Sequence, residues 1–201
     1  MIDPVYTAAA TAFVDLVAQI PDGTWDRPGL GDWDLRALVG HTTRSLTTVS
    51  TYLRAPAERE DVTGPAHYYD MVVRGYAANS VEVLERGRAA GRDLGTEPAA
   101  RIAELAEGAL ADLAAADDPL ITVIGGLGIR LSNYLPTRVF ELTVHGLDIA
   151  RATALPFAPP EAALRSATAL AAQIATLSGQ GESVLLALTG RGSLPAGFSV
   201  V

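Results

Sequence analysis

The stretch RVFELTVHGLDIA, from Arg138 to Ala150, decides both the expected fold and the expected chemistry. Its ionisable side chains are Arg138, Glu141, His145 and Asp148. At about 100° of helical rotation per residue, these four fall within a stripe about 80° wide. The other positions are mostly apolar, so the sequence predicts a buried helix with one polar stripe. Buried ionisable groups are costly unless they are paired or coordinate something.

Two of these residues are spaced to share a ligand. Glu141 and His145 are four positions apart, so both side chains can reach one point beside the helix. A third candidate is His41, which follows Leu38 by three positions on the apolar face of an earlier expected helix. Imidazole and carboxylate both suit divalent cations such as zinc, and three protein ligands leave a coordination position open, as in catalytic zinc sites. The sequence therefore predicts a metal site.

Each of these residues also has an ordinary structural explanation. Glu141 and His145 could form an ion pair within the helix, and His41 could be a buried or capping histidine. Arg138 and Asp148 could pair with neighbouring residues. The protein would then be a non-catalytic helical bundle that binds a small apolar ligand or a partner helix, with the polar stripe as an internal network. A structural metal site with no turnover lies between these alternatives.

Hydrophobic periodicity predicts further helices on both sides of this stretch. Asp3 and Asp34 are the expected N-caps of the first two. The later expected helices span approximately residues 66–92, 98–113, 132–152 and 161–178, and the apolar positions of the first of these are Tyr69, Val72, Val73, Tyr76, Val83 and Leu84. Residues 120–124 are β-branched and could be a short strand or a buried loop. The runs 183–188 and 198–201 are expected to form a hairpin.

The expected fold is therefore mainly α, formally α+β, in a chain of 201 residues. A length of this order fits one domain with a small appendage. We expect a metal-binding helical bundle over residues 1–155 and a small C-terminal α/β segment, a helix plus a hairpin, over residues 156–201. Prolines at positions 156, 159 and 160 mark the expected linker.

The composition excludes several classes of chemistry. The chain has no cysteine and no lysine, which excludes disulfides, a cysteine nucleophile, Schiff-base chemistry and a Walker phosphate loop. A net charge of −8 argues against nucleic acid as a partner. The N-terminus lacks a basic and apolar leader, and no apolar run is long enough to span a membrane, so we expect a cytoplasmic protein without a membrane partner.

Three stretches, in this order, resemble the mycothiol-dependent maleylpyruvate isomerase family of the wider DinB/YfiT-like superfamily. They are GDWDLRALVGH at 31–41, RVFELTVHGLDIA at 138–150, and LALTGR at 186–191 with PAGF at 195–198. The resemblance runs nearly end to end, from residue 3 to residue 201. It implies a DinB/YfiT-like four-helix bundle with a divalent metal, commonly zinc, on two histidines and a glutamate, which here are His41, His145 and Glu141.

The resemblance also implies a low-molecular-weight thiol, mycothiol, as cofactor or co-substrate of an isomerase or thiol transferase. We expect a thiolate, formed by coordination to the metal, to attack a small electrophilic substrate. Asp148 is expected to orient a ligand, Arg138 to bind an acidic substrate or balance Glu141, and Arg191 to act as an anion clamp in the tail. The protein is expected to be a monomer or a homodimer.

Overall fold

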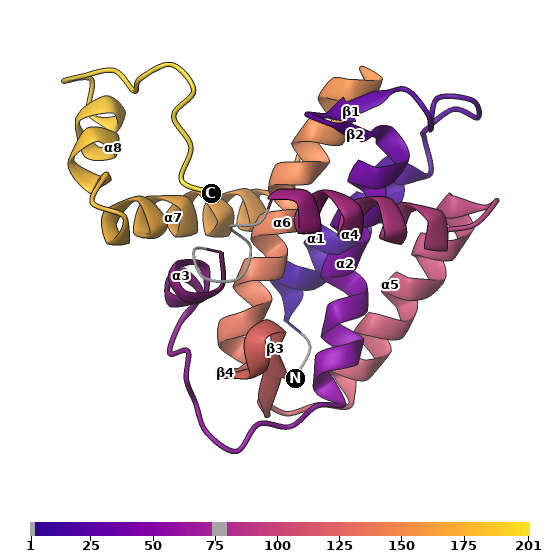
Figure 1. The fold of residues 1–201 in the computed structure, drawn as a ribbon, viewed down its shortest axis with the longest axis horizontal. Helices are drawn as coiled ribbons and strands as arrows, with labels where there is room; N and C mark the ends of the chain where they lie inside the picture. The colour runs from indigo at the N-terminus through magenta and orange to yellow at the C-terminus, as the bar shows by residue number, and fades with distance from the viewer. Residues whose placement is uncertain (1–2, 74–79) are drawn as a thin grey trace.

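The computed structural model describes residues 3–73 and 80–201, with the side chains of Val73 and Ser80 left out, and it is mainly helical with two small antiparallel sheets (Figure 1). The long helices are α1 (Pro4–Val17), α2 (Leu35–Leu53), α5 (Pro98–Ala114), α6 (Leu131–Thr153) and α7 (Glu161–Leu177). The sheets are β1 (Pro28–Leu30) with β2 (Trp33–Asp34), and β3 (Leu120–Val123) with β4 (Leu127–Arg130). Within the described ranges, no helix is both long and apolar enough to cross a membrane.

Both expected N-caps are confirmed. The Asp3 carboxylate accepts hydrogen bonds from the backbone N–H groups of Val5 and Tyr6, at 2.8 and 3.0 Å, and begins α1. The Asp34 carboxylate accepts one from the N–H of Ala37 at 2.7 Å and begins α2. Each cap satisfies backbone donors that have no partner within the helix and stabilises it by about 1 kcal/mol.

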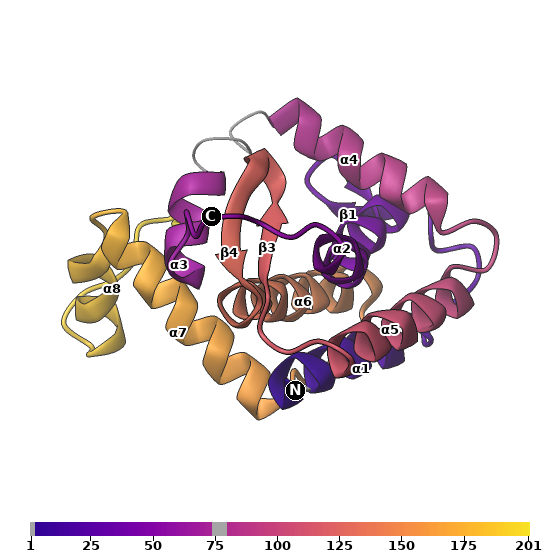
Figure 2. The same cartoon turned by 90° about the horizontal axis from the view of Figure 1, so that it is seen from below.

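Helix α6 forms the centre of the molecule. It packs against α1, α2 and α7, and in Figure 1 it runs between α2 and α5 on one side and α7 on the other. Figure 2 shows it from below, surrounded by these helices and the β3–β4 hairpin. Its apolar residues Val139, Leu142 and Ile149 are at most 1% exposed, so the expected buried helix is confirmed. The four-helix bundle as a specific architecture stays a prediction.

The expected single helix over residues 66–92 is wrong. Its first part forms α3 (Pro65–Tyr68) and a π-helix (Tyr69–Val73), while α4 (Ser80–Asp93) is a separate helix. α3 packs against α6 and α7, whereas α4 packs against α2. The two parts thus pack against different helices, which one straight helix could not achieve. Tyr76, one of the expected apolar positions, lies outside the described residues.

The strand alternative for residues 120–124 is confirmed, but its partner strand was not expected. β3 pairs antiparallel with β4, and Ile121 lies opposite Ile129. Gly125 and Gly126 adopt positive φ angles of 79° and 74° and turn the chain into β4.

The expected C-terminal hairpin is wrong. Residues Gly181–Leu188 form the helix α8, and no strand is present in the described residues beyond α7. The run is rich in leucine and alanine, which are strong helix formers. Because α7 packs against α6 and α1, the segment 156–201 begins with a helix that contacts the bundle, and a domain boundary after residue 155 stays a prediction.

A close contact between α2 and α4 positions the beginning of α2. A Cβ atom on Gly40 would lie 2.2 Å from the backbone nitrogen of Gly91, so only glycine allows the two backbones this approach. Near the same crossing, the indole of Trp33 donates a hydrogen bond from Nε1 to the carbonyl of Leu84 at 3.0 Å. A Cβ on Gly87 would collide with that indole at 2.6 Å. Gly40 and Gly91 therefore let α4 pack closely on α2, and Gly87 leaves room for the indole of Trp33. This packing surrounds the turn of α2 that carries His41, the residue after Gly40.

We predict that Gly40→Ala lowers the free energy of unfolding by at least about 2 kcal/mol, because the added methyl group must push α2 away from α4. The matched control is Gly108→Ala in the exposed face of α5, where a Cβ meets nothing within 4 Å. That change should raise the free energy of unfolding by about 0.5–1 kcal/mol through helix propensity. Urea unfolding followed by circular dichroism measures both, and equal effects would contradict the close approach.

Candidate metal centre

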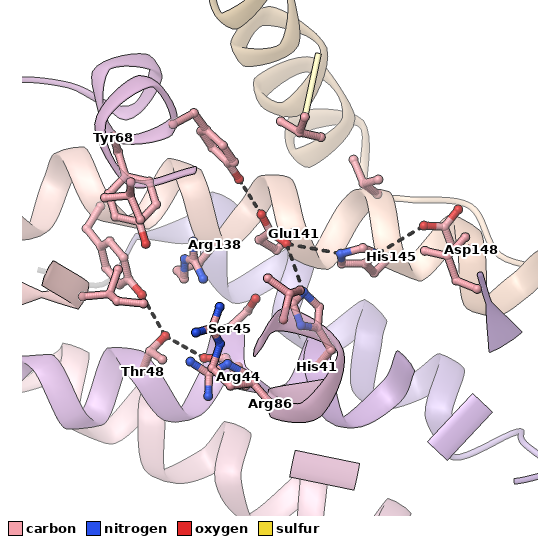
Figure 3. A pocket seen from close by; sticks show the side chains of 18 of the residues that line it. His41, Arg44, Ser45, Thr48, Tyr68, Arg86, Arg138, Glu141, His145 and Asp148 are labelled. Carbon is pink, nitrogen blue, oxygen red and sulfur yellow. Dashed lines mark hydrogen bonds and ion pairs between the residues drawn. The ribbon is translucent and has the colours of Figure 1, made fainter. Parts of the chain in front are cut away.

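The three expected metal ligands converge at one point. His41 comes from α2, and Glu141 and His145 come from adjacent turns of α6. Oε2 of Glu141 lies 3.8 Å from Nε2 of His41 and 3.3 Å from Nε2 of His145. One ligand atom from each residue lies within 4.8 Å of the other two, and Figure 3 shows the two imidazoles directed at the carboxylate.

His145 is held by a second carboxylate. Its Nδ1 lies 3.1 Å from Oδ2 of Asp148, one turn further along α6, and Oδ1 of Asp148 lies 3.3 Å from the guanidinium of Arg151. Burial lowers the pKa of His145, but the hydrogen bonds with Asp148 and Glu141 outweigh burial and raise it to about 9. Asp148 therefore lies where a residue that orients His145 must lie, with Nε2 left to face Glu141.

Glu141 is fixed by a residue that the sequence did not indicate for the site. The hydroxyl of Tyr69, at the start of the π-helix, donates a 2.6 Å hydrogen bond to Oε1 of Glu141. Oε2 is left to face the two histidines. Burial raises the pKa of Glu141, but hydrogen bonds from His145 and His41 hold it well below its ordinary range. From the sequence, Tyr69 was expected only as an apolar position of a helix. The signal that could have indicated its role is its phenol, because a buried tyrosine hydroxyl needs a hydrogen-bond partner.

His41 is held by packing. Its ring centroid lies 4.6 Å from the Trp33 ring, and its Nδ1 is buried without a hydrogen-bond partner within the described residues. Burial is the main cause that lowers the pKa of His41 below its ordinary value. His41 is therefore neutral at pH 7, the form in which imidazole binds a metal.

The three ligands fit a divalent cation. Ligand atoms about 2.1 Å from a tetrahedral ion lie about 3.4 Å from one another, close to the 3.3 and 3.8 Å between Glu141 and the two histidines. Two imidazoles and one carboxylate are a donor set of the kind found in catalytic zinc sites. The cluster offers three candidate ligand atoms in the described ranges, so a four-coordinate cation held by them would have one position open.

The open side of the cluster faces a cavity of about 490 Å³. The four residues of the predicted polar stripe, Arg138, Glu141, His145 and Asp148, all line this cavity. His41 lines it from α2. Aromatic and aliphatic side chains form much of the remaining wall, among them Trp33, Tyr68, Tyr134 and Val144. This is the character of a small-molecule site.

Arg191 is not brought to this cavity. It is exposed after α8, and its guanidinium donates to the carbonyl of Thr189 at 3.0 Å. The tail does reach the cavity, but through Ser199 and Val201. Two other arginines that the sequence had not indicated, Arg44 and Arg86, line the wall instead. Their positions depend on how α2 and α4 cross, which their local sequence does not reveal.

A family model described as the mycothiol maleylpyruvate isomerase N-terminal domain matches residues 6–150. The matched region is more than half of the chain and contains all three candidate metal ligands. No curated protein and no solved structure matches the chain.

We predict that the metal-free protein loses stability as the pH rises from 6.5 to 9. The folded state raises the pKa of His145 from 6.5 to about 9, so it binds the proton more tightly than the unfolded chain. Its stabilisation is complete below pH 6.5 and is lost through pH 9, by about 3 kcal/mol at most. Urea unfolding at each pH in the presence of chelator measures it. His145→Gln should flatten the profile, and an unchanged slope would contradict the assignment.

We predict that Tyr69→Phe weakens zinc binding by about 10- to 100-fold, because the carboxylate of Glu141 loses the hydrogen bond that fixes it. The control is Tyr52→Phe, another tyrosine of the cavity wall, whose hydroxyl has no hydrogen-bond partner in the described ranges. Competition with a zinc indicator measures both affinities. Equal affinities of the two variants would show that the Tyr69 hydroxyl does not hold the ligand.

Proposed function

The chain belongs to the mycothiol maleylpyruvate isomerase N-terminal domain family, and we propose that it is a metal-dependent enzyme that uses mycothiol in an isomerisation or a thiol-transfer reaction. The observation that carries the proposal is the convergence of His41, Glu141 and His145 at the wall of a cavity large enough for a small molecule. The family membership supports the thiol, and the side-chain geometry supports the metal.

In this proposal His41, Glu141 and His145 hold a divalent cation, with zinc the metal best matched to the donor set. When bound, the cation supplies Lewis-acid chemistry, which lowers the pKa of a coordinated thiol and makes it a nucleophile at neutral pH. The chain has no cysteine, so the sulfur nucleophile must come from outside the protein.

The residues around the cation have separate tasks. Asp148 accepts the hydrogen bond from Nδ1 of His145, which keeps Nε2 free for the metal. The Tyr69 hydroxyl occupies Oε1 of Glu141, so Oε2 is the oxygen directed at the metal. Trp33, Tyr68 and Tyr134 give the cavity an apolar wall beside the candidate ligands, and a substrate packed against that wall would displace water from the reacting atoms.

The thiol addition fits an electrophile with an activated carbon–carbon double bond. The sulfur forms a bond to one carbon, and the π-electron pair moves to the neighbouring activated position. Rotation about the resulting single bond, followed by loss of the sulfur, returns the isomerised double bond and the thiol. If the adduct is retained, or if an epoxide or a halide is the electrophile, the same nucleophile gives thiol transfer.

The alternative of a non-catalytic bundle with an internal polar network has one observation in its favour. Glu141 already has polar partners in Tyr69, His145 and His41 without any cation. In that alternative the adjoining cavity would hold a small apolar ligand, and the two histidines would serve only as polar partners of Glu141. A measurement of metal binding distinguishes the metal-dependent enzyme from the non-catalytic bundle.

We predict about one divalent ion per chain in protein purified without chelator, and at least a tenfold loss of zinc affinity in His41→Ala. The matched control is His67→Ala, which removes the remaining histidine of the chain; His67 accepts a hydrogen bond from the N–H of Thr63 and does not line the cavity. Elemental analysis and competition titration measure both. A metal-free protein that takes up no ion would overturn the proposal.

We further predict that mycothiol added to the cobalt-substituted protein produces a sulfur-to-cobalt charge-transfer band in the near ultraviolet. An S-methylated mycothiol, which cannot form a thiolate, is the control and should give no such band. If mycothiol does not change the cobalt spectrum, the protein binds metal but does not activate the thiol at that metal.

A further inference from the structure

Helix α8 carries two leucines that the described residues leave largely in contact with water. Leu185 and Leu188 are 62% and 71% exposed, and no side chain of α8 is buried. In Figure 1 the helix stands at the end of α7, at the margin of the molecule, and α7 is the element that it mainly packs against. Single exposed leucines are ordinary, but two on one side of a short helix form an apolar patch.

The helix is too short to be stable through its own hydrogen bonds. It has eight residues, and an isolated helix of fewer than about 12 residues is marginal in water. Helices of this length are stabilised mostly by packing of an apolar face. Val184 and Ala187 are half-buried, but Leu185 and Leu188 add nothing to that packing. A partner that covers these two leucines would therefore stabilise α8.

A hollow of about 520 Å³ adjoins the two leucines. Ala172 and Thr176 of α7 line it from one side, and Leu185 and Leu188 line it from the other. The small residues of α7 leave room there for an apolar side chain from another molecule. The surface thus combines a projecting part, the leucines, with a receiving part, the hollow. Self-association about a two-fold axis requires such a combination, because the same surface must serve on both copies.

Two charged residues at opposite ends of α8 have no ionic partner. Glu182, in the first turn, is exposed and makes no hydrogen bond or ion pair within residues 3–73 and 80–201. Arg191, which does not reach the cavity, is held at the other end by a 2.8 Å hydrogen bond from its N–H to the carbonyl of Leu186. In the same described ranges its guanidinium donates only to the carbonyl of Thr189. Nine residues of helix span about 13 Å, so the two charges cannot pair within one chain.

The spacing of these residues is symmetrical about the centre of α8. Glu182 precedes Leu185 by three positions, and Arg191 follows Leu188 by three positions. When a second α8 lies alongside in the opposite direction, centre against centre, Leu185 faces the partner's Leu188 and Glu182 faces the partner's Arg191. The antiparallel direction also brings the positive end of each helix dipole beside the negative end of the other. Because the arrangement is two-fold, each contact occurs twice.

We infer that the α8 face, formed by Glu182, Leu185, Leu188 and Arg191, is the contact surface of a homodimer in which it pairs antiparallel with the α8 face of a second copy of this chain. The face lies beyond residues 6–150 and contains none of the candidate metal ligands, so the inference does not depend on the proposed function.

Size and charge define the kind of association. An eight-residue helix is about 12 Å long, so the contact buries less than the roughly 800 Å² per partner of a standard interface. The dimer is therefore reversible, with a dissociation constant on the order of 10–100 μM. A membrane is a poorer match, because helices that bind anionic lipid surfaces are rich in basic residues, whereas this chain has a net charge of −8 and its α8 face carries one acid and one base.

The test is sedimentation equilibrium of the full chain from about 1 μM to about 1 mM, with chelator present to exclude association through a shared metal ion. We expect the mass to rise from that of one chain towards that of two. Leu188→Ser should weaken association at least tenfold, because the lost leucine contact occurs twice. The matched control is Val81→Ser on α4, which is 64% exposed and remote from α8 in Figures 1 and 2, and it should change nothing. A chain that stays monomeric throughout, or equal association of the two variants, overturns the inference.

Charge variants test the antiparallel direction. Glu182→Arg and Arg191→Glu each place like charges opposite one another in their own homodimers, so each should self-associate at least about fivefold more weakly than the unsubstituted chain. A mixture of the two variants restores both opposite-charge pairs, and heterodimers should form with about the original affinity. Both positions are exposed, so folding is unaffected, which far-ultraviolet circular dichroism checks. A mixture without preference for the heterodimer overturns the antiparallel pairing.

Vesicles separate the membrane alternative from the second copy. The probe is a vesicle of phosphatidylcholine and phosphatidylglycerol, tested by co-sedimentation with the unsubstituted chain and with Leu188→Ser. Binding that needs Leu188, from a chain that stays monomeric in solution, overturns the homodimer in favour of a lipid surface. A dimer that Leu188→Ser disrupts, from a chain that leaves the vesicles unbound, is the result that the inference predicts. A dimer that Leu188→Ser leaves intact uses another surface and overturns the assignment to α8.

Discussion

The carboxylate of Glu141 is the group on which the site depends. It is mostly buried, and three separate elements compensate its charge: α2 through His41, the π-helix through Tyr69, and α6 through His145. A carboxylate in this position would be too costly without them. The need to satisfy one charge therefore fixes how α2, α6 and the π-helix meet. It also leaves Oε2 between two imidazoles, which is the arrangement a divalent cation requires.

Much of the helical fold and the three candidate ligands could be predicted from sequence because those signals are local. The caps at Asp3 and Asp34, the polar stripe on α6 and the position of His41 on an apolar helix face follow from spacing alone. Tyr69 and Arg44 could not be assigned in the same way. Each reaches the site only through the crossing of helices far apart in sequence, and neither stands in a recognisable pattern.

The wrong predictions have different causes. Residues 183–188 carry an apolar run whose period does not separate strand from helix, and they form part of α8, which has no buried side chain. The leucines and alanine of this run favour a helix through their own propensity. The expected helix over 66–92 has apolar residues throughout, but its two parts pack against different helices. Those contacts between elements far apart in sequence are absent from any local window.

The site divides into two sides of opposite electrostatic character. Asp148 on one side orients His145, and on the other Arg44, Arg86 and Arg138 make an acidic protein locally basic. A bound cation would add to that positive potential and favour anions in the cavity. The most direct test of the central claim is the zinc-edge X-ray absorption spectrum of the zinc-loaded protein. It should show two imidazole nitrogens and one carboxylate oxygen about 2.0–2.2 Å from the metal. A first shell of water oxygens, or of a single imidazole, would contradict the convergence of His41, Glu141 and His145 on one ion.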